Sequence, residues 1–386
     1  MTRLKVMTIL GTRPEIIRLS RILPRLDAHF DHAIVHTGQN WDPTLNANLF
    51  QDLGLRRPDH HLDVASATLG QTLGKILAES ERVIAHVRPD ALLVLGDTNS
   101  ALSALMARRR KVPVYHMEAG NRAFDRNVPE EMNRRILDHI ADFNLVYTEQ
   151  ARQNLLAEGL PARRIFLTGS PLAEVLDHYG PQIRASDVLD RLGLLAGQFL
   201  LASLHREENV DDPDRLSALM AGLLAVARHF DLPVILSGHP RTRDRLERLG
   251  AFPLDPRLYW MEPLGFLDYA HLQGAAFCTI SDSGSVAEES AILGFPAITP
   301  RESSERPEGL EAGPLLITAP DPAAMLAGVI TATRLFAERR ATGQGPVLPQ
   351  AYAIADSSAR VVSLIEGTAR LAPVWDGLRP AAGPVP

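Results

Sequence analysis

The chain has 386 residues, more than a single hydrophobic core usually serves, so two domains are expected. Hydrophobic residues make up 45% and charged residues 22% of the chain, the balance of an ordinary globular protein. The formal net charge of −6 argues against a general affinity for nucleic acid or an anionic membrane surface, and neither partner is expected.

Cysteine usage and the apolar runs indicate the compartment. The one cysteine, Cys278, lies in an apolar run and has no partner for an internal disulfide, which fits a reducing environment. The first apolar run, 6–10, is too short for the core of a signal peptide. No stretch approaches the roughly 20 apolar residues that span a membrane. The sequence therefore predicts a cytoplasmic protein.

Short apolar runs alternate with longer amphipathic segments in the first part of the chain. The runs predict strands over 5–10, 33–37, 91–95, 112–116, 143–147 and 165–168. The segments between them predict helices over 14–26, 69–87, 100–109 and 130–141. Because the strand runs are almost continuously hydrophobic, we expect strands buried on both faces, as in a parallel sheet covered by helices.

A second series of strands follows the segment 170–197, whose prolines and glycines suit a connection between domains. The predicted strands are 199–203, 234–237, 258–261, 277–281, 297–299 and 315–318. We therefore expect an N-terminal domain over 1–170 and a C-terminal domain over 171–353. A helix over about 354–370 is expected to pack back on the first domain. The proline- and glycine-rich tail 374–386 is expected to be loose.

This alternation predicts the α/β class, with two Rossmann-like doubly wound domains and a cleft between them. Ligands of such sheets bind beyond the carboxyl ends of the strands, so polar residues directly after a strand are candidates. Arg13 and Arg18 follow the first strand, and Asp97 follows the third. Position alone leaves two interpretations open. The arginines can be solvated residues of a tidy turn, and the aspartate can simply cap the next helix.

Three segments of the second domain raise the same question. His205 follows the strand at 199–203, and His239 follows the next strand. A histidine can exchange protons near neutral pH or bind phosphate, but a single one is more often structural. The segment 281–285, SDSGS, opens a helix whose free N–H groups favour a phosphate, although a helix cap explains it equally well.

No metal site is predicted. The sequence has no HExxH segment and no cysteine cluster, and the pair His60 and His61 is interpreted as part of a solvated loop. A serine triad of the GxSxG type is also not expected, because no such elbow follows a strand.

The order of the polar segments is more specific than any one of them. They resemble, in sequence and spacing, the non-hydrolysing UDP-N-acetylglucosamine 2-epimerases, from residue 11 to about residue 313. The segments are GTRPEIIR, GDT, HMEAGNR, PEEMNRR, SLHRE, SGHP, SDSGSVAEE and SERPEGLEAG. The resemblance implies a glycosyltransferase-B arrangement with the active site in the interdomain cleft. It also implies a homodimeric cytoplasmic isomerase that needs no cofactor and inverts C2 of a UDP-HexNAc sugar for cell-surface polysaccharide synthesis.

The resemblance also implies roles for single residues. The catalytic candidates are the acid–base groups Asp97, Glu118, Glu130 and His205. The substrate-binding candidates comprise cations, the loop for the UDP diphosphate and a glutamate for the ribose: Arg13, Arg18, Arg134, His239, Ser283, Gly284, Ser285 and Glu289. In the family reaction, anti elimination of UDP gives a 2-acetamidoglucal, and re-addition of UDP then gives the sugar with the opposite configuration at C2. A proton leaves one face of C2 and returns on the other, so at least two acid–base groups are needed.

Three departures from the family pattern bear on the substrate. Arg18 replaces a lysine, Ser285 replaces the second glycine of the phosphate loop, and the segment 39–42 reads QNWD instead of QHRE. The last change puts activation by UDP-GlcNAc in doubt. The combination of the segments TGQNWD, HMEAGNRAFD and DHIADFNL looks closer to subfamilies acting on modified sugars, which include UDP-2,3-diacetamido-glucuronate and the 6-deoxy-talosamine precursor of N-acetylfucosamine. A glycosyltransferase-B enzyme, a hydrolase and a non-catalytic sensor are the alternatives.

Overall fold

The computed structural model describes residues 3–39, 49–251, 255–312, 315–345 and 348–378. The chain divides into two compact units, each described below by itself. Unit 1 consists of Met1–Arg122, Pro129–Val175 and Ile354–Pro386, and unit 2 consists of Ala123–Val128 and Leu176–Ala353.

Unit 1 contains a seven-stranded parallel sheet in the order β3-β2-β1-β4-β5-β6-β7. Its strands are β1 (Lys5–Leu10), β2 (Asp31–His36), β3 (His60–His61), β4 (Ala91–Leu95), β5 (Val114–Ala119), β6 (Phe143–Val146) and β7 (Ile165–Leu167). The strand order reverses between β1 and β4, which are neighbours in the sheet: β2 and β3 lie on one side of β1, and the strands after β4 lie on the other side. In doubly wound sheets, ligands bind beyond the carboxyl ends of strands at this reversal.

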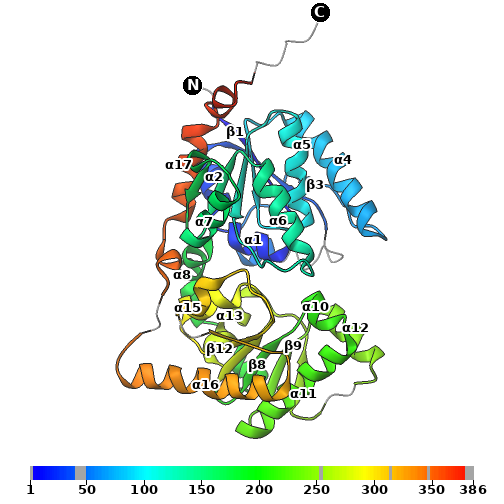
Figure 1. Ribbon diagram of the computed structural model, residues 1–386, viewed down its shortest axis with the longest axis vertical. Helices are drawn as coiled ribbons and strands as arrows, with labels where there is room; N and C mark the ends of the chain where they lie inside the picture. Colours follow the sequence, from blue (N-terminus) through cyan, green and yellow to red (C-terminus); the bar gives the residue numbers. More distant parts are fainter. Residues whose placement is uncertain (1–2, 40–48, 252–254, 313–314, 346–347, 379–386) are drawn as a thin grey trace, which may run out of the picture. The chain divides into compact units, whose positions relative to one another are not determined.

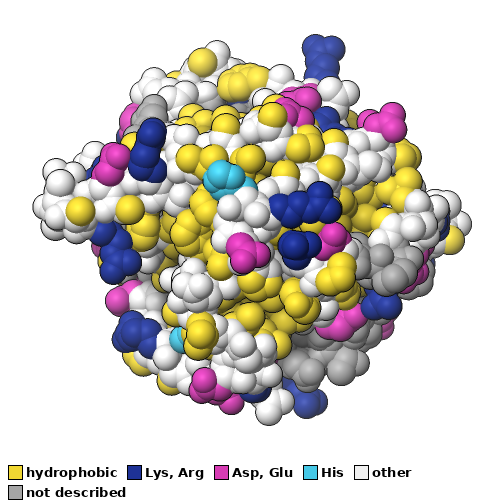
Figure 2. Space-filling view, turned by 90° about the horizontal axis from the view of Figure 1, so that it is seen from below, with side chains coloured by type: hydrophobic (Ala, Val, Ile, Leu, Met, Phe, Trp, Pro, Cys, Tyr) yellow, Lys and Arg dark blue, Asp and Glu magenta, His cyan; other side chains and the backbone are white. Residues whose placement is uncertain are grey.

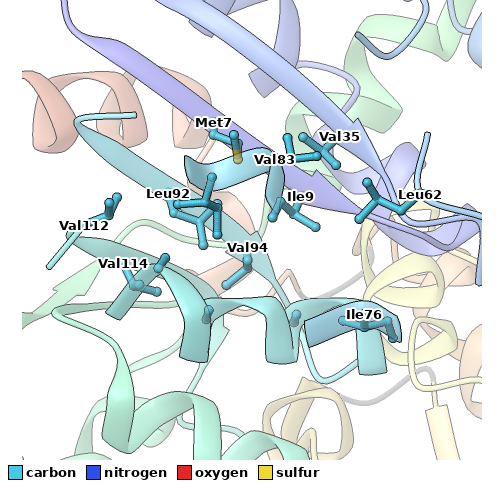
Figure 3. Packing of buried hydrophobic residues seen from close by; sticks show 14 of the residues in the cluster. Met7, Ile9, Val35, Leu62, Ile76, Val83, Leu92, Val94, Val112 and Val114 are labelled. Atoms are coloured by element: carbon cyan, nitrogen blue, oxygen red, sulfur yellow. The ribbon is translucent and has the colours of Figure 1, made fainter. Parts of the chain in front are cut away.

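Helices cover both faces of this sheet (Figure 1). They are α1 (Arg13–Leu19), α2 (Ile22–His29), α4 (Leu69–Val87), η1 (Asn99–Ser103), α5 (Ala104–Arg109), α6 (Pro129–Ile140), α7 (Glu149–Ala157), η2 (Ala162–Arg164), α17 (Ser357–Thr368) and α18 (Ala372–Trp375). Figure 3 shows the core between the strands and α4, where Leu92 and Val94 of β4 lie near Ile76 and Val83. These four side chains are at most 2% exposed, so the core is closed to water.

Unit 2 repeats the same architecture with a six-stranded parallel sheet in the order β10-β9-β8-β11-β12-β13. Its strands are β8 (Leu200–Ser203), β9 (Val234–Ser237), β10 (Leu258–Met261), β11 (Cys278–Ser281), β12 (Ala297–Pro300) and β13 (Leu315–Thr318). Its helices are α9 (Val188–Leu192), α10 (Glu207–Val210), α11 (Pro213–Phe230), α12 (Pro240–Arg248), α13 (Phe266–Ala275), α14 (Val286–Leu293), α15 (Pro307–Ala312), α16 (Pro322–Ala341) and η3 (Gln350–Ala353). Here the reversal lies between β8 and β11.

The α/β class is confirmed, and the predicted strands of both sheets are present, but two local predictions are wrong. The single helix predicted over 14–26 is two helices, because Pro24 has no N–H to donate to the carbonyl of Ser20, where α1 ends. The pair His60 and His61 is not a loop; it forms β3 and pairs in parallel with β2 at the sheet edge.

The C-terminal segment after unit 2 returns to unit 1. Helix α17 packs beside α2, as Figure 1 also shows. Within the tail segment, the structure describes residues 374–378, and Val374 and Trp375 belong to α18. Asp376 receives a 2.5 Å hydrogen bond from Arg164, which ties this end of the chain to the sheet at β7. Residues 379–386 lie outside the described part of the chain.

Helix α8 (Pro171–Arg184) occupies the segment predicted as a connection; it begins in unit 1 and ends in unit 2.

A cavity of about 740 Å³ lies in unit 2 at the amino ends of β11 and β12, beside Phe277, Phe295 and Phe336. The cavity therefore lies at the opposite end of the strands from their carboxyl ends, where ligands of such sheets bind. Figure 2, which views the molecule from below Figure 1, shows hydrophobic patches interspersed with charged side chains.

Candidate functional site

The carboxyl end of the unit 1 sheet brings two of the candidate acids together with arginines. Asp97 follows β4, and its Oδ2 receives a 2.8 Å hydrogen bond from Nε of Arg134 on α6. Glu118 lies near the end of β5, and its Oε2 is 3.7 Å from Nε of Arg18 on α1. Both arginines are at most 5% exposed. The carboxyl end of the unit 1 sheet therefore carries two partly exposed carboxylates, each next to a buried arginine.

Glu118 has an unusual backbone conformation. Its φ is +63°, in the left-handed region, and the pairing of β5 with β6 shifts register between Met117 and Ala119. A bulge of this kind redirects a side chain, and a non-glycine residue at positive φ carries strain that the surrounding structure must support. Such strain is concentrated at functional sites, which favours a role for this carboxylate.

A buried ionic network supports the loops on either side of these acids. His116 of β5 contacts the carbonyl oxygen of Gly96 through Nε2 at 2.8 Å and Asp138 of α6 through Nδ1 at 3.0 Å. Burial alone would lower the pKa of His116, but the hydrogen bond and charge of Asp138 raise it. Asp138 also accepts the backbone N–H of Gly120 and a 2.6 Å bond from Arg122. The network thus connects the residues that precede Asp97 and follow Glu118.

Glu15 connects the first loop of unit 1 to the loop after β4. Its Oε2 accepts hydrogen bonds from the backbone N–H groups of Gly11 and Thr12, at 3.0 and 2.8 Å, and from the Thr12 hydroxyl. Its Oε1 accepts a 3.1 Å bond from the hydroxyl of Thr98. Burial raises the pKa of Glu15 to about 7 despite these four hydrogen bonds. Sequence reasoning missed Glu15, although its place in a capping box was readable.

Glu130 and Arg13 are the other two candidates of unit 1. Glu130 is partly buried in the first turn of α6, where a carboxylate suits the helix dipole. Arg13 is the first residue of α1, and burial lowers the pKa of its guanidinium. Glu131, the residue after Glu130, is buried and receives a 2.8 Å hydrogen bond from Arg134.

The segment linked to substrate choice is only partly described. Gln39 accepts hydrogen bonds from the backbone and the hydroxyl of Ser100, at 3.1 and 2.8 Å, so it supports the loop after β4. Residues 40–42, which complete the proposed departure from the activator segment, lie outside the described residues.

The reversal point of the unit 2 sheet carries the second group of candidates. His205 follows β8, and the segment with Ser283, Gly284 and Ser285 follows β11. The hydroxyls of Ser283 and Ser285 lie 2.9 Å apart, at the amino end of α14. Backbone N–H groups at a helix start attract a phosphate, so this loop can hold a diphosphate. Ser285 has φ −75°, so the position does not require the glycine usual in the family.

Glu289 lies on α14 and accepts a 2.6 Å hydrogen bond from Gln273 of α13. Gln273 is 2% exposed and was missed by sequence reasoning, because a glutamine within a helix gives no sequence signal. The bond holds one carboxylate oxygen of Glu289 in place. A carboxylate fixed in this way can accept the hydroxyls of a ribose.

Asp282 is a further residue that sequence reasoning missed. It is fully buried and accepts the backbone N–H groups of His205 and Arg206 and the side-chain amide of Asn209, at 3.0 to 3.1 Å. Its Oδ1 is also 3.0 Å from Nδ1 of His205. Burial alone would raise the pKa of Asp282, but His205 and these hydrogen bonds lower it to about 2. His239 lies close by, with its ring centroid 6.2 Å from that of His205.

None of the described helices has the length and apolar character needed to cross a membrane. No group of three or more histidine, cysteine, aspartate or glutamate side chains with the geometry of a metal site occurs in the part of the chain that the structure describes.

Comparisons with known proteins point in one direction. The family model described as UDP-N-acetylglucosamine 2-epimerase matches residues 24–366. The structure of UDP-N-acetylglucosamine 2-epimerase from Rickettsia bellii superposes with a TM-score of 0.89 at 41% identity, covering 97% of this chain and all of the other. The Methanocaldococcus jannaschii UDP-GlcNAc 2-epimerase in complex with UDP-GlcNAc and UDP gives a TM-score of 0.87 at 34% identity, covering 94% and 99%.

A relative with a different named substrate matches almost as well. UDP-2,3-diacetamido-2,3-dideoxy-D-glucuronate 2-epimerase of Pseudomonas aeruginosa is 36% identical over 308 residues, which are 78% of this chain and 84% of the relative. The fold, the order of the polar segments and these comparisons agree. The chain belongs to the UDP-N-acetylglucosamine 2-epimerase family.

Proposed function

We propose that this protein inverts C2 of a UDP-N-acetylhexosamine, of the UDP-GlcNAc to UDP-ManNAc type, without net hydrolysis. The observation that carries the proposal is the pair of sites at the two reversal points. Unit 1 presents Asp97 and Glu118 with buried arginines, and unit 2 presents a phosphate-type loop with His205. We propose that both act on one UDP-sugar, as the glycosyltransferase-B arrangement of the family implies.

The chemistry asks for these residue types. The C1–O bond breaks first, its electron pair leaving with UDP, and the ring gains oxocarbenium character. The loop 283–285 and nearby cations stabilise the leaving diphosphate, and carboxylates stabilise the positive ring. A protein base then takes the C2 proton, which gives the 2-acetamidoglucal. A second acid returns a proton to the opposite face of C2 as UDP adds back to C1. Asp97, Glu118, Glu130 and His205 are the proposed acid–base set.

Deuterium exchange tests the proposal. Incubation with UDP-GlcNAc in deuterium oxide should place deuterium at C2 of both epimers. Proton NMR measures the exchange as loss of the C2 proton signal. Asp97→Asn should slow exchange by about 100-fold or more, the usual effect of losing an acid–base group. The exposed carboxylate of Asp187 provides the control, and Asp187→Asn should exchange at the wild-type rate. Absence of exchange with every sugar tested would refute epimerase activity.

The same samples distinguish the alternatives. A hydrolase would release free UDP and sugar irreversibly, and a glycosyltransferase would release UDP only when an acceptor is added. The identity to the P. aeruginosa relative supports a modified sugar as a second candidate substrate. The panel therefore includes UDP-2,3-diacetamido-2,3-dideoxy-glucuronate and a 6-deoxy UDP-HexNAc, and the substrate is the sugar with the highest kcat/KM.

We propose further that the protein acts as a cytoplasmic homodimer in the supply of polysaccharide precursors. Exposed apolar side chains support the dimer: Met132 and Ile136 lie one turn apart on α6, 64% and 41% exposed, and Leu105 of α5, a helix that contacts α6, is 37% exposed. Met132→Glu should shift the mass found by light scattering from dimer to monomer. Leu195→Glu, which changes a 72% exposed residue of unit 2, is the control. A wild-type monomer would contradict this proposal.

A further inference from the structure

The hydrogen bonds around His205 and His239 determine which ring nitrogen of each neutral imidazole carries the proton. Asp282 is fully buried, and its Oδ1 is 3.0 Å from Nδ1 of His205. An ionised carboxylate can only accept hydrogen bonds, so Nδ1 of His205 must be the donor. The neutral ring therefore carries its proton on Nδ1, and the lone pair is on Nε2, across the ring. The His205 side chain is 36% exposed, which leaves the ring open to a ligand.

His239 has the opposite arrangement. It is the N-cap of α12, and its Nδ1 accepts the backbone N–H of Arg241 at 3.2 Å. A nitrogen that accepts a hydrogen bond carries no proton, so the neutral ring is protonated on Nε2. Protonation of Nδ1 would break this bond and leave a backbone N–H of the first helical turn without its acceptor.

We propose that Asp282 and the cap of α12 hold the two neighbouring histidines in opposite tautomers, which gives them different roles toward a UDP-sugar. His205 presents a bare Nε2 that accepts a proton, and His239 presents an Nε2–H that donates to an anionic oxygen. Asp282 is the positioning residue. The assignment of these roles rests on the proposed function, whereas the tautomers depend only on the geometry of unit 2.

The other contacts of Asp282 make the effect of an amide predictable. Its Oδ2 accepts from the N–H of Arg206, the N–H of His205 and the amide of Asn209, at 3.1, 3.1 and 3.0 Å, whereas its Oδ1 shares only the N–H of His205, at 3.0 Å, among these donors. In Asp282→Asn, the amide oxygen must take the Oδ2 position, because an NH₂ group there would face these donors. The NH₂ group then faces Nδ1 of His205, which must become an acceptor. The variant should therefore move the proton of His205 from Nδ1 to Nε2.

Five charged or titratable groups are described around His205. They are Asp282 after β11, His239 at α12, Arg206 beside His205, Tyr269 of α13 behind Asp282, and Glu305, whose Oε1 is 3.2 Å from Nη2 of Arg206. Because Asp282 is the group in contact with Nδ1 of the ring, Asp282→Asn should have the largest effect on the tautomer of His205.

The test is nitrogen-15 NMR of the full chain with labelled histidine, without ligand. Wild-type protein should show His205 protonated at Nδ1 and His239 at Nε2, each assigned by its loss in His205→Ala and His239→Ala. Asp282→Asn should convert His205 to the Nε2–H form and reduce kcat by a factor of about 10³ to 10⁴, as at other aspartate–histidine pairs, with KM changed less than threefold.

Asp212→Asn is the matched control, because Asp212 also accepts two backbone N–H groups, at 2.9 and 3.1 Å, but caps α11. It should leave the His205 tautomer and kcat unchanged. An Nε2–H form of His205 in the wild type would overturn the proposal, even if Asp282→Asn does not fold. Correct tautomers in a protein that exchanges no sugar would refute the proposed function and leave the tautomer assignment standing.

Discussion

The guanidinium of Arg134 donates a 2.8 Å hydrogen bond from Nε to Oδ2 of Asp97, which ties helix α6 to the loop after β4. A second bond of the same guanidinium reaches Oε2 of Glu131 at 2.8 Å. Arg134 is 3% exposed, so this guanidinium bridges two carboxylates where water has little access. It fixes the orientation of a proposed catalytic acid.

Substitution of Arg134 should separate charge from geometry. Arg134→Lys keeps the charge, but its single nitrogen cannot occupy the positions of both Nε and Nη1, so kcat should fall about 10- to 100-fold with a small loss of stability. Arg134→Met leaves both carboxylates without their cation, and the free energy of unfolding should fall by about 3 kcal/mol. Deuterium exchange and urea denaturation measure the two effects. Arg135→Lys, at a 46% exposed arginine of the same helix, should change neither. Wild-type kcat in Arg134→Met would contradict the assigned role.

The positive φ of Glu118 predicts that two variants with the same loss of activity differ in stability. Glu118→Ala and Glu118→Gly both remove the carboxylate, so both should lose activity by about 100-fold or more. Glycine accepts φ +63° without the steric cost that alanine bears. The glycine variant should therefore be more stable than the alanine variant by about 1 kcal/mol. Urea denaturation compares them, and an alanine variant of equal or greater stability would show that the site is unstrained.

Much of the fold could be predicted from sequence because its signals are local. Continuous apolar runs predicted the buried parallel strands, and β4 was predicted with its observed bounds. The edge strand β3 could not be predicted, since its two histidines have no apolar pattern and pair only through the backbone of β2. The break between α1 and α2 could have been predicted from Pro24.

Candidate site residues at strand ends were predictable, but their supporting partners were not. Asp97 and His205 directly follow strands, so their position in the sequence reveals them. Asp282 also follows a strand, yet its bond to His205 joins residues 77 positions apart. Glu15 is likewise linked to Thr98 across 83 positions. Only the crossover topology brings such residues together, and one sequence without its fold carries no sign of it.

Glu15 predicts a pH dependence of stability. Its pKa is about 7 in the folded state and about 4.5 in the unfolded chain, so folding favours the protonated form. The resulting stability is fully present below pH 4.5 and is lost as the pH rises through 7. The loss should be on the order of 3 kcal/mol, because each unit of pKa corresponds to about 1.4 kcal/mol.

Glu15→Gln removes this titration while its amide keeps the described hydrogen bonds. Its oxygen can accept from Gly11 and Thr12, and its NH₂ can donate to the Thr98 hydroxyl. Between pH 5 and pH 8, unfolding by urea should therefore depend less on pH in the variant than in the wild type. Glu149→Gln, at an exposed residue of α7, should retain the wild-type slope. Equal slopes in Glu15→Gln and the wild type would show that Glu15 is ionised throughout this range.

Gly284 should be essential for binding of the diphosphate, because there is no room for a side chain. A Cβ at this position would lie 2.4 Å from Oε1 of Glu305 and 3.1 Å from Nη2 of Arg206. Neither neighbour can move freely, since they bond each other at 3.2 Å and Arg301 holds the other oxygen of Glu305 at 3.0 Å. Overpacking of this kind costs about 1 to 3 kcal/mol and displaces the loop.

Calorimetric titration with UDP should therefore give a Kd at least about tenfold higher for Gly284→Ala than for the wild type, since 1.4 kcal/mol corresponds to a factor of ten. Gly274→Ala is the control within unit 2, because its Cβ would meet nothing within 4 Å. It should leave the Kd for UDP unchanged and raise stability by about 0.5 to 1 kcal/mol, as replacement of a helical glycine usually does. If Gly284→Ala bound UDP as tightly as the wild type, the diphosphate would have to bind elsewhere than at the amino end of α14.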